Sequence, residues 1–317
     1  MLNTPINETM NNISFPTLAV IIPTLNSERT INATLVSVLR QTLRPQEIIV
    51  VDNGSNDRTI EIVRLLEKKS PVQIKTFRQN IEGAGPARNL GVQKSNSEML
   101  AFLDSDDTWT HDKIEKQLHF HINQKDIISG TYAFYLNEYQ KRVRVSKKYN
   151  SNFEFGIDLY KNQQLPFLLS SWMISRENFL LTGEFDSKYK YAQDFEFFFR
   201  ALRKGIRPFL IPESLLTYTI SSRSATSRNY AQQSLSAAHV RRNQSDFELS
   251  LEDFVSSDNF KFSRYRDNMS GLMTRKAMVN SGNKLQFLTL FWLLGSIVIS
   301  PKTFIIKIYR YYKSILS

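Results

Sequence analysis

The segment FLDSDDTW at residues 102–109 carries the clearest structural signal in this sequence. It begins inside the apolar run from Met99 to Leu103 and turns polar at Asp104, as a buried strand does where it ends in a loop. Asp104 and Asp106 stand two positions apart in that loop. Hard divalent cations such as Mg²⁺ and Mn²⁺ prefer carboxylate oxygens and also bridge to the oxygens of a diphosphate. The pair is therefore a candidate metal site at the end of a strand.

Earlier segments repeat the pattern of a strand, a polar turn and a helix. The apolar runs at 18–22 (LAVII) and 47–51 (EIIVV) end at Pro23 and Asp52, and each is followed by apolar residues at helical spacing. Residues 72–77 (VQIKTF) alternate as in a strand. Strands separated by helices of this length imply right-handed βαβ crossovers. The sequence therefore predicts an α/β fold with a Rossmann-like, mostly parallel sheet flanked by helices.

The ends of two of these strands should lie close together. In open parallel sheets, ligands bind in the crevice beyond the carboxyl ends of the strands. Asp52 and Asp104 each follow a strand directly, so both should face that crevice although they are 52 positions apart. The glycines at 83 and 85 would let the backbone approach a ligand closely, and Arg88 in the helix that follows is a candidate contact for phosphate or a donor sugar.

The composition limits the classes of function that this chain can have. Hydrophobic residues make up 41% of the 317 residues and charged residues 22%, as in a globular protein with a real core. The absence of cysteine excludes disulfides, iron–sulfur clusters and cysteine-ligated zinc, and four scattered histidines argue against a zinc enzyme. The net charge of +11 is uneven, because the last fifty residues contain seven Lys or Arg and no acid.

The C-terminal region contains two apolar stretches. Residues 285–299 (LQFLTLFWLLGSIVI) are strongly apolar but shorter than the ~20 residues that span a bilayer. After Pro301, a helical projection places aromatic and aliphatic side chains on one face and basic side chains on the other. Such a helix suits an anionic lipid interface, so we expect a basic amphipathic tail that binds a membrane. The alternative is that both helices close the core or form a dimer interface.

Four motifs together resemble a known enzyme family. PTLN at 23–26, VDNGSND at 51–57, GPARNLG at 85–91 and FLDSDDTW at 102–109 occur in the order found in the family-2 glycosyltransferases with the GT-A fold. The resemblance covers about residues 17–220. It implies an inverting, metal-dependent enzyme that transfers a sugar from a nucleotide diphosphate donor to an acceptor, as in bacterial enzymes that build O-antigen or capsule.

The resemblance also implies roles for individual residues. A nucleoside diphosphate would lie across the strand ends, with Asp52 at the base and Asp104 near the ribose. Asp106, together with Asp104, would hold Mn²⁺ or Mg²⁺. Asn53 stands where many members of the family carry a second acid. The expected donor contacts are Pro23, Thr24, Asn26, Asp52, Asn53, Gly85, Arg88, Asp104 and Ser105.

Inversion requires a carboxylate that takes the proton of the attacking acceptor hydroxyl. The family's Glu-Asp pair before a helix corresponds to Gln193-Asp194 in KYAQDFEFFFR, and the resemblance makes Asp194 the catalytic base. The structural alternative is that Asp194 merely caps the helix that follows. Glu196 and Asp186 are the substitutes for the role of base. Further contacts to the diphosphate or the acceptor are expected from Gln193, Arg200 and Arg223.

The chain should divide into three parts. We expect a flexible tail at 1–16, a GT-A domain at 17–220 and a C-terminal helical extension at 221–317. Within the domain, residues 17–110 would form the nucleotide-binding half and residues 111–220 the acceptor half. The first residues lack the basic start and apolar run of a signal peptide, so we expect a cytoplasmic protein.

By similarity to the family, the expected donor is a UDP-sugar that carries glucose or galactose, with dTDP-rhamnose as the alternative. The expected acceptor is a saccharide on undecaprenyl diphosphate at the inner face of the cytoplasmic membrane.

Two other classes of protein match parts of the sequence. Sugar-phosphate nucleotidylyltransferases carry a Gly-rich loop with an arginine directly after the first strand, where this chain has PTLNSE at 23–28. A nucleic-acid-binding protein would account for the pI near 9.6. Since the basic excess lies in an apolar tail, we expect no nucleic-acid partner.

Overall fold

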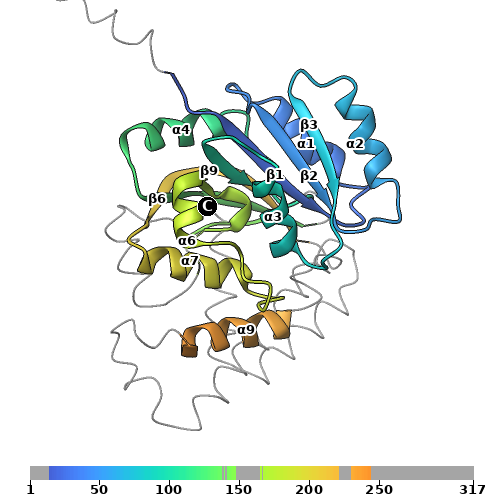
Figure 1. The fold of residues 1–317 in the computed structure, drawn as a ribbon. Helices are drawn as coiled ribbons and strands as arrows, with labels where there is room; N and C mark the ends of the chain where they lie inside the picture. The colour runs from blue at the N-terminus through green and yellow to red at the C-terminus, as the bar shows by residue number, and fades with distance from the viewer. Residues whose placement is uncertain are drawn as a thin grey trace, which may run out of the picture.

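One sheet organises the part of the chain that the structure describes (Figure 1). The computed structural model describes residues 14–137, 139, 141–147, 165, 167–220 and 230–243. Nine strands from these residues form the sheet in the order β3-β2-β1-β4-β8-β6-β9-β5, with β7 paired to β6. The strands are β1 (Leu18–Thr24), β2 (Glu47–Asp52), β3 (Gln73–Arg78), β4 (Met99–Phe102), β5 (Thr108–Trp109), β6 (Ile127–Asn137), β7 (Arg142–Val145), β8 (Met173–Ser175) and β9 (Arg207–Ile220).

Helices cover both faces of the sheet. Alternate residues of β1 belong to two different hydrophobic cores, one on each face. Helices α1, α2 and α4 contribute to the first core, and α3, α6, α7 and α9 contribute to the second. The helices are α1 (Ile31–Leu39), α2 (Thr59–Glu67), α3 (Ala84–Gln93), α4 (Lys113–Asn123), α6 (Arg176–Thr182), α7 (Gln193–Arg203) and α9 (Tyr230–Asn243), with a 3₁₀ turn η1 (Leu169–Ser171).

The first four strands in space are parallel, as the sequence predicts. β1 pairs with β2 and β4, and β2 pairs with β3, all in parallel register. β1 and β2 are buried along their whole length because helices cover both faces, which explains their continuous runs of Val and Ile. In this register Thr24 pairs with Asp52. The polar residues that follow β1, β2 and β4 therefore lie at one edge of the sheet.

The second half of the sheet is mixed. β8 is antiparallel to both β4 and β6, β9 is parallel to β6, and β5 is antiparallel to β9. The expectation of a mostly parallel sheet thus holds for the first four strands, and the remaining strands add pairs of both kinds.

Aromatic side chains fix α7 against the sheet. Phe185, in the loop before α7, stacks on Phe197 with ring centroids 4.6 Å apart and meets Phe102 of β4 edge-on at 5.6 Å. Phe197 also stacks on Phe179 of α6. Aromatic pairs of this geometry contribute about 0.5–1.5 kcal/mol each beyond the burial of their area. Because Phe102 is the last residue of β4, these contacts tie α7 to the end of the sheet that carries Asp104.

Several expected features lie outside the described residues. They include residues 1–13, Arg223 and the apolar and basic segments within 285–317. In the described part of the C-terminal extension, α9 buries Val240 in the second core. No helix in the described ranges is both long and apolar enough to cross a membrane.

Candidate active site

A four-residue turn presents the acidic residues at the end of β4. The amide of Asp107 donates to the carbonyl of Asp104 (3.1 Å), which leaves Ser105 and Asp106 at the central positions of the turn. The carbonyl of Ser105 accepts from the hydroxyl of Thr34 in α1 (3.0 Å). The turn is therefore attached to the helix that follows β1, as well as to its own strand.

Asp104 forms an ion pair with Arg88 of α3. The side chain of Arg88 is 3% exposed and that of Asp104 is 37% exposed. A guanidinium that deeply buried requires a charged or polar partner. Arg88 is therefore built into the site and is not a surface arginine of a basic protein.

Asp106 is the acidic residue without a partner in this turn. Within the described residues, no ion pair or hydrogen bond to its carboxylate occurs beyond that of its own amide. Burial, and then the neighbouring carboxylate of Asp104, raise the pKa of Asp106 to about 6. A divalent cation fits here because it would supply the positive charge that Asp106 lacks, beside an Asp104 that is already paired with Arg88.

The protein would supply only part of the coordination shell of such a cation. The described residues contain no group of three or more His, Asp or Glu side chains arranged to hold a metal. Mg²⁺ commonly binds through one or two carboxylates together with substrate phosphates and water. The Asp104–Asp106 pair matches that arrangement.

Two side chains at the ends of β1 and β2 have buried polar atoms without a hydrogen-bond partner among the described residues. The hydroxyl of Thr24 and the side-chain oxygen of Asn53 are buried and have no partner among the described residues. Asp52, which is 3% exposed, accepts the amide of Ser55 through Oδ1 (2.9 Å). Asn26 adopts a positive φ of 50° and donates its amide to the Ser55 hydroxyl (2.9 Å). Since buried polar atoms normally have partners, Thr24 and Asn53 are placed to meet a ligand.

Three of the other residues expected to contact the ligand make contacts within the protein, and a fourth lies outside the described residues. Pro23 lies within β1, and the hydroxyl of Ser105 lies 2.7 Å from that of Ser27. At Gly85, an added Cβ would lie 3.4 Å from a side chain in the loop before α7, so α3 packs closely there. Arg223 falls outside the described residues.

Asp194 is the second residue of α7 and not its cap. The cap position is Ala192, which is left-handed (φ 66°, ψ 26°), while Oδ1 of Asp194 accepts the amide of Phe195 (2.9 Å). Burial is the main influence on the Asp194 carboxyl and raises its pKa, which the Phe195 amide and Arg88 lower and Asp104 raises. Gln193, the residue before Asp194, contacts Arg88, which in turn pairs with Asp104, so the start of α7 lies beside this ion pair.

Gln193 connects α7 to the acidic turn through Arg88. With the Gln193 amide oriented so that its oxygen faces Arg88, that oxygen accepts from Nη1 of Arg88 (3.0 Å), and the side-chain nitrogen donates to the carbonyls of Tyr189 (3.2 Å) and Lys190 (3.1 Å). Nη2 of Arg88 contacts Asp104. A glutamate at this position could not donate to the two carbonyls. Local sequence patterns do not reveal this connection, because Gln193 and Arg88 are 105 positions apart.

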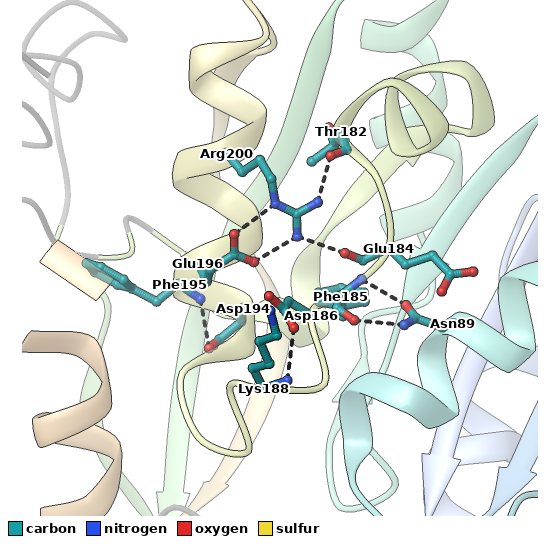
Figure 2. Close-up of polar contacts among 10 residues, drawn as sticks. All are labelled: Asn89, Thr182, Glu184, Phe185, Asp186, Lys188, Asp194, Phe195, Glu196 and Arg200. Carbon is teal, nitrogen blue, oxygen red and sulfur yellow. Dashed lines mark hydrogen bonds and ion pairs between the residues drawn. The ribbon is translucent and has the colours of Figure 1, made fainter. Parts of the chain in front are cut away.

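The guanidinium of Arg200 bonds to residues of α6, α7 and the loop between them (Figure 2). It donates to both carboxylate oxygens of Glu196 (2.8 and 2.7 Å) and to the carbonyls of Thr182 (2.6 Å) and Glu184 (2.7 Å). These bonds join α6, the loop after it and α7. They argue against the expected diphosphate contact of Arg200 and assign it a structural role. Glu196 is correspondingly a poor substitute for the base.

Replacing Arg200 with alanine should lower stability more than activity. The change leaves the largely buried carboxylate of Glu196 without its partner. Breaking a fully buried pair costs about 3–5 kcal/mol, and the partial exposure of Arg200 reduces the expected loss to about 2 kcal/mol. Urea unfolding measures this loss, and Arg203→Ala on the exposed face of α7 serves as the control. A fully folded Arg200→Ala protein with a ~100-fold lower kcat would show that Arg200 acts on the substrate.

Comparison with protein families agrees with this geometry. The model of the family described as "Glycosyl transferase family 2" matches residues 19–181, about half of the chain. Over 196 residues the chain is 32% identical to an uncharacterized glycosyltransferase of Haemophilus influenzae, and the match covers 61% of this chain and 74% of that protein.

Two further matches involve proteins whose names state a ligand or a reaction. Over 112 residues the chain is 37% identical to the UDP-Glc:alpha-D-GlcNAc-diphosphoundecaprenol beta-1,3-glucosyltransferase WfaP of Escherichia coli, covering 35% of this chain and 44% of that protein. The structure of S. aureus TarS residues 1–349 in complex with UDP-GlcNAc superposes with a TM-score of 0.53 at 18% identity, covering 90% of both chains. The likeness to TarS concerns the fold alone.

Proposed function

Since the chain belongs to glycosyl transferase family 2, we propose that it transfers glucose or galactose from a UDP-sugar to a lipid-linked saccharide, with inversion at the anomeric carbon. The observation that carries this proposal is the double contact of Arg88 with Asp104 and Gln193. It brings the acidic turn, which would face the diphosphate, next to Asp194, the candidate base. An inverting transfer needs a base and a leaving-group site on opposite sides of one carbon atom.

Two similar proteins support the choice of substrates. WfaP is named for transfer from UDP-Glc to a GlcNAc linked to diphosphoundecaprenol, and TarS was solved with UDP-GlcNAc. We propose a saccharide on undecaprenyl diphosphate as the acceptor here, in the synthesis of O-antigen or a similar surface polysaccharide. Because such a carrier stays in the bilayer, the protein would work as a peripheral protein at the inner face of the cytoplasmic membrane.

The residues at the strand ends would bind the donor. Asp52, Thr24 and Asn53 would offer their buried polar atoms to the base and ribose. Asp106 and Asp104 are the residues that would hold Mn²⁺ or Mg²⁺. When bound, the cation supplies positive charge that stabilises the departing diphosphate without proton transfer.

Asp194 would take the proton of the acceptor hydroxyl. As the bond from the acceptor oxygen to the anomeric carbon forms, the bond from that carbon to the diphosphate oxygen breaks, and the proton passes to the carboxylate. A carboxylate with a raised pKa is a stronger base than an ordinary one. The Phe195 amide and Arg88 oppose that increase and so favour the ionised form that a base requires.

The pH at which kcat/KM falls on the acid side should be higher than the ordinary pKa of an aspartate. A general base acts only when ionised, and burial raises the pKa of Asp194. The kcat/KM should therefore fall as the pH drops through this raised value and stay level above it. Arg88→Gln removes a charge that lowers this pKa, so it should move the acid limb to higher pH. The kcat/KM measured between about pH 4 and 8 tests this, and a limb near pH 4 that Arg88→Gln does not move would contradict it.

A transfer assay tests the proposed reaction. The purified protein is incubated with Mn²⁺, a GlcNAc-diphospholipid acceptor, and UDP-glucose, UDP-galactose or dTDP-rhamnose in separate reactions. We expect mass spectrometry to show the addition of one hexose from a UDP-sugar, and NMR to show an anomeric configuration opposite to that of the donor. A product that retains the donor configuration, or transfer from dTDP-rhamnose alone, would contradict the proposal.

A further inference from the structure

Ser170 contacts the acidic turn from a distant part of the chain. Its hydroxyl accepts the amide of Asp104 (3.2 Å), although the two residues are 66 positions apart. Its carbonyl accepts the indole N–H of Trp109 (2.7 Å). Ser170 lies in η1 and is 2% exposed. It therefore holds the chain at the first residue of the turn and again just after the last.

Asp107 attaches the other end of the same turn. Its side chain is fully buried, its amide donates to the carbonyl of Asp104 (3.1 Å), and its Oδ1 accepts the amide of Thr219 in β9 (3.1 Å). Oδ2 of Asp107 is buried without a hydrogen-bond partner among the described residues, so the Thr219 amide is the contact that holds this side chain. Both ends of the turn are thus fastened to buried groups.

The carboxylate of Asp106 differs from its neighbours in the turn, because no other described residue bonds to it. Asp104 has Arg88 and Ser170, Asp107 has Thr219, and within the described residues the Asp106 carboxylate has only its own amide. The direction in which Asp106 points is therefore set by the backbone of the turn. A site held to within about 0.5 Å by supporting residues binds its ligand better than a looser one.

We propose that Ser170 is a positioning residue, which fixes the Asp104–Asp107 turn and so directs the Asp106 carboxylate toward the metal and the donor diphosphate. This inference rests on the proposed function for its ligand. If the inference is right, replacing Ser170 removes no metal ligand. It instead makes the turn that carries the ligand Asp106 more mobile.

The neighbouring Ser171 provides a matched control. It is fully buried in the same 3₁₀ turn, and its hydroxyl accepts the amide of Thr131 (3.3 Å) and donates to the carbonyl of Leu168 (2.7 Å). Ser170→Ala and Ser171→Ala each remove one buried hydroxyl and should destabilise the fold to a similar degree. Only Ser170→Ala frees the acidic turn.

Amide hydrogen exchange tests the local effect. Ser170→Ala should speed exchange of the Asp104 amide about tenfold, as expected when one hydrogen bond is lost, while Ser171→Ala should speed exchange of the Thr131 amide instead. Calorimetry should show Mn²⁺-dependent UDP affinity about tenfold weaker in Ser170→Ala and within about twofold of wild type in Ser171→Ala. Ser170→Cys retains a weak hydrogen-bonding group and should give intermediate values, which keeps the test usable if alanine prevents folding.

Two results would overturn the inference. One is an Asp104 amide that exchanges equally slowly in Ser170→Ala and wild type, and the other is an equal loss of UDP affinity in the two alanine variants. If wild type itself fails to bind UDP with Mn²⁺, the proposed function is wrong. The exchange of the Asp104 amide would then still decide whether Ser170 fixes the turn.

Discussion

Replacing Asp194 with asparagine should retain donor binding and reduce transfer by a factor of about 10²–10⁴. Asparagine keeps the shape of the side chain, and its oxygen can still accept the amide of Phe195, so the start of α7 should remain in place. It cannot take the proton of the acceptor hydroxyl. The loss should therefore appear in kcat, measured in the transfer assay, while the calorimetric Kd for UDP stays within about threefold of wild type.

Asp186→Asn is the control for this prediction. Asp186 lies in the loop before α7 and accepts the amide of Lys188 (2.9 Å), so it is another carboxylate of the same region with a local backbone bond (Figure 2). The Asp186→Asn variant should have a kcat within about twofold of wild type. Near-normal turnover in Asp194→Asn would remove Asp194 as the base, and loss of turnover in Asp186→Asn alone would transfer the role to Asp186.

Replacing Asp106 with alanine should abolish metal-dependent donor binding and lower turnover by about 10³-fold or more. A bound cation at a departing diphosphate contributes several kcal/mol to the transition state, and about 1.4 kcal/mol corresponds to each factor of ten. Excess EDTA should have the same effect on the wild type. Asp112→Asn is the control, because Asp112 pairs with Lys116 in α4. Full activity of the wild type in EDTA would contradict the metal assignment.

The stability of an Asp106 variant should move in the opposite direction to its activity. In the folded chain the pKa of Asp106 is raised from 3.8 to about 6, so the ionised carboxylate opposes folding at neutral pH. This penalty is absent below the unfolded pKa and complete above the folded one. Asp106→Asn, without metal at pH 7, should thus unfold at the same or a higher urea concentration than wild type. A clear loss of stability would show that Asp106 serves the fold.

The arrangement of the strand ends could be predicted from the sequence. The apolar runs of β2 and β4 end at Asp52 and just before Asp104, and the end of such a run is a local signal. Because both strands pair in parallel with β1, their ends lie at one edge of the sheet. Asp104 meets Arg88 there, a contact that the sequence patterns did not predict. The prediction that these strands run parallel and end at one edge is confirmed, because strand ends and helix starts depend mainly on residues close in the sequence.

The rest of the site depends on contacts that no local pattern specifies. Gln193 reaches Arg88 and Ser170 reaches Asp104 because β8 inserts antiparallel beside β4 and the loop before α7 packs on Phe102. The charge of Arg200 suggested a phosphate contact, yet its partners are Glu196 and two backbone carbonyls. Which partner a long polar side chain finds is decided by tertiary packing, and residue type alone does not determine it.

Calorimetric titration of the wild-type protein with UDP, with and without Mn²⁺, tests the central claim most directly, with dTDP and GDP as comparisons. We predict that UDP binds only when Mn²⁺ is present, that dTDP and GDP bind more weakly, and that Asp106→Ala abolishes UDP binding. UDP binding of equal strength without metal, or no binding of any of the three nucleotides, would contradict a metal-dependent donor site at the Asp104–Asp107 turn.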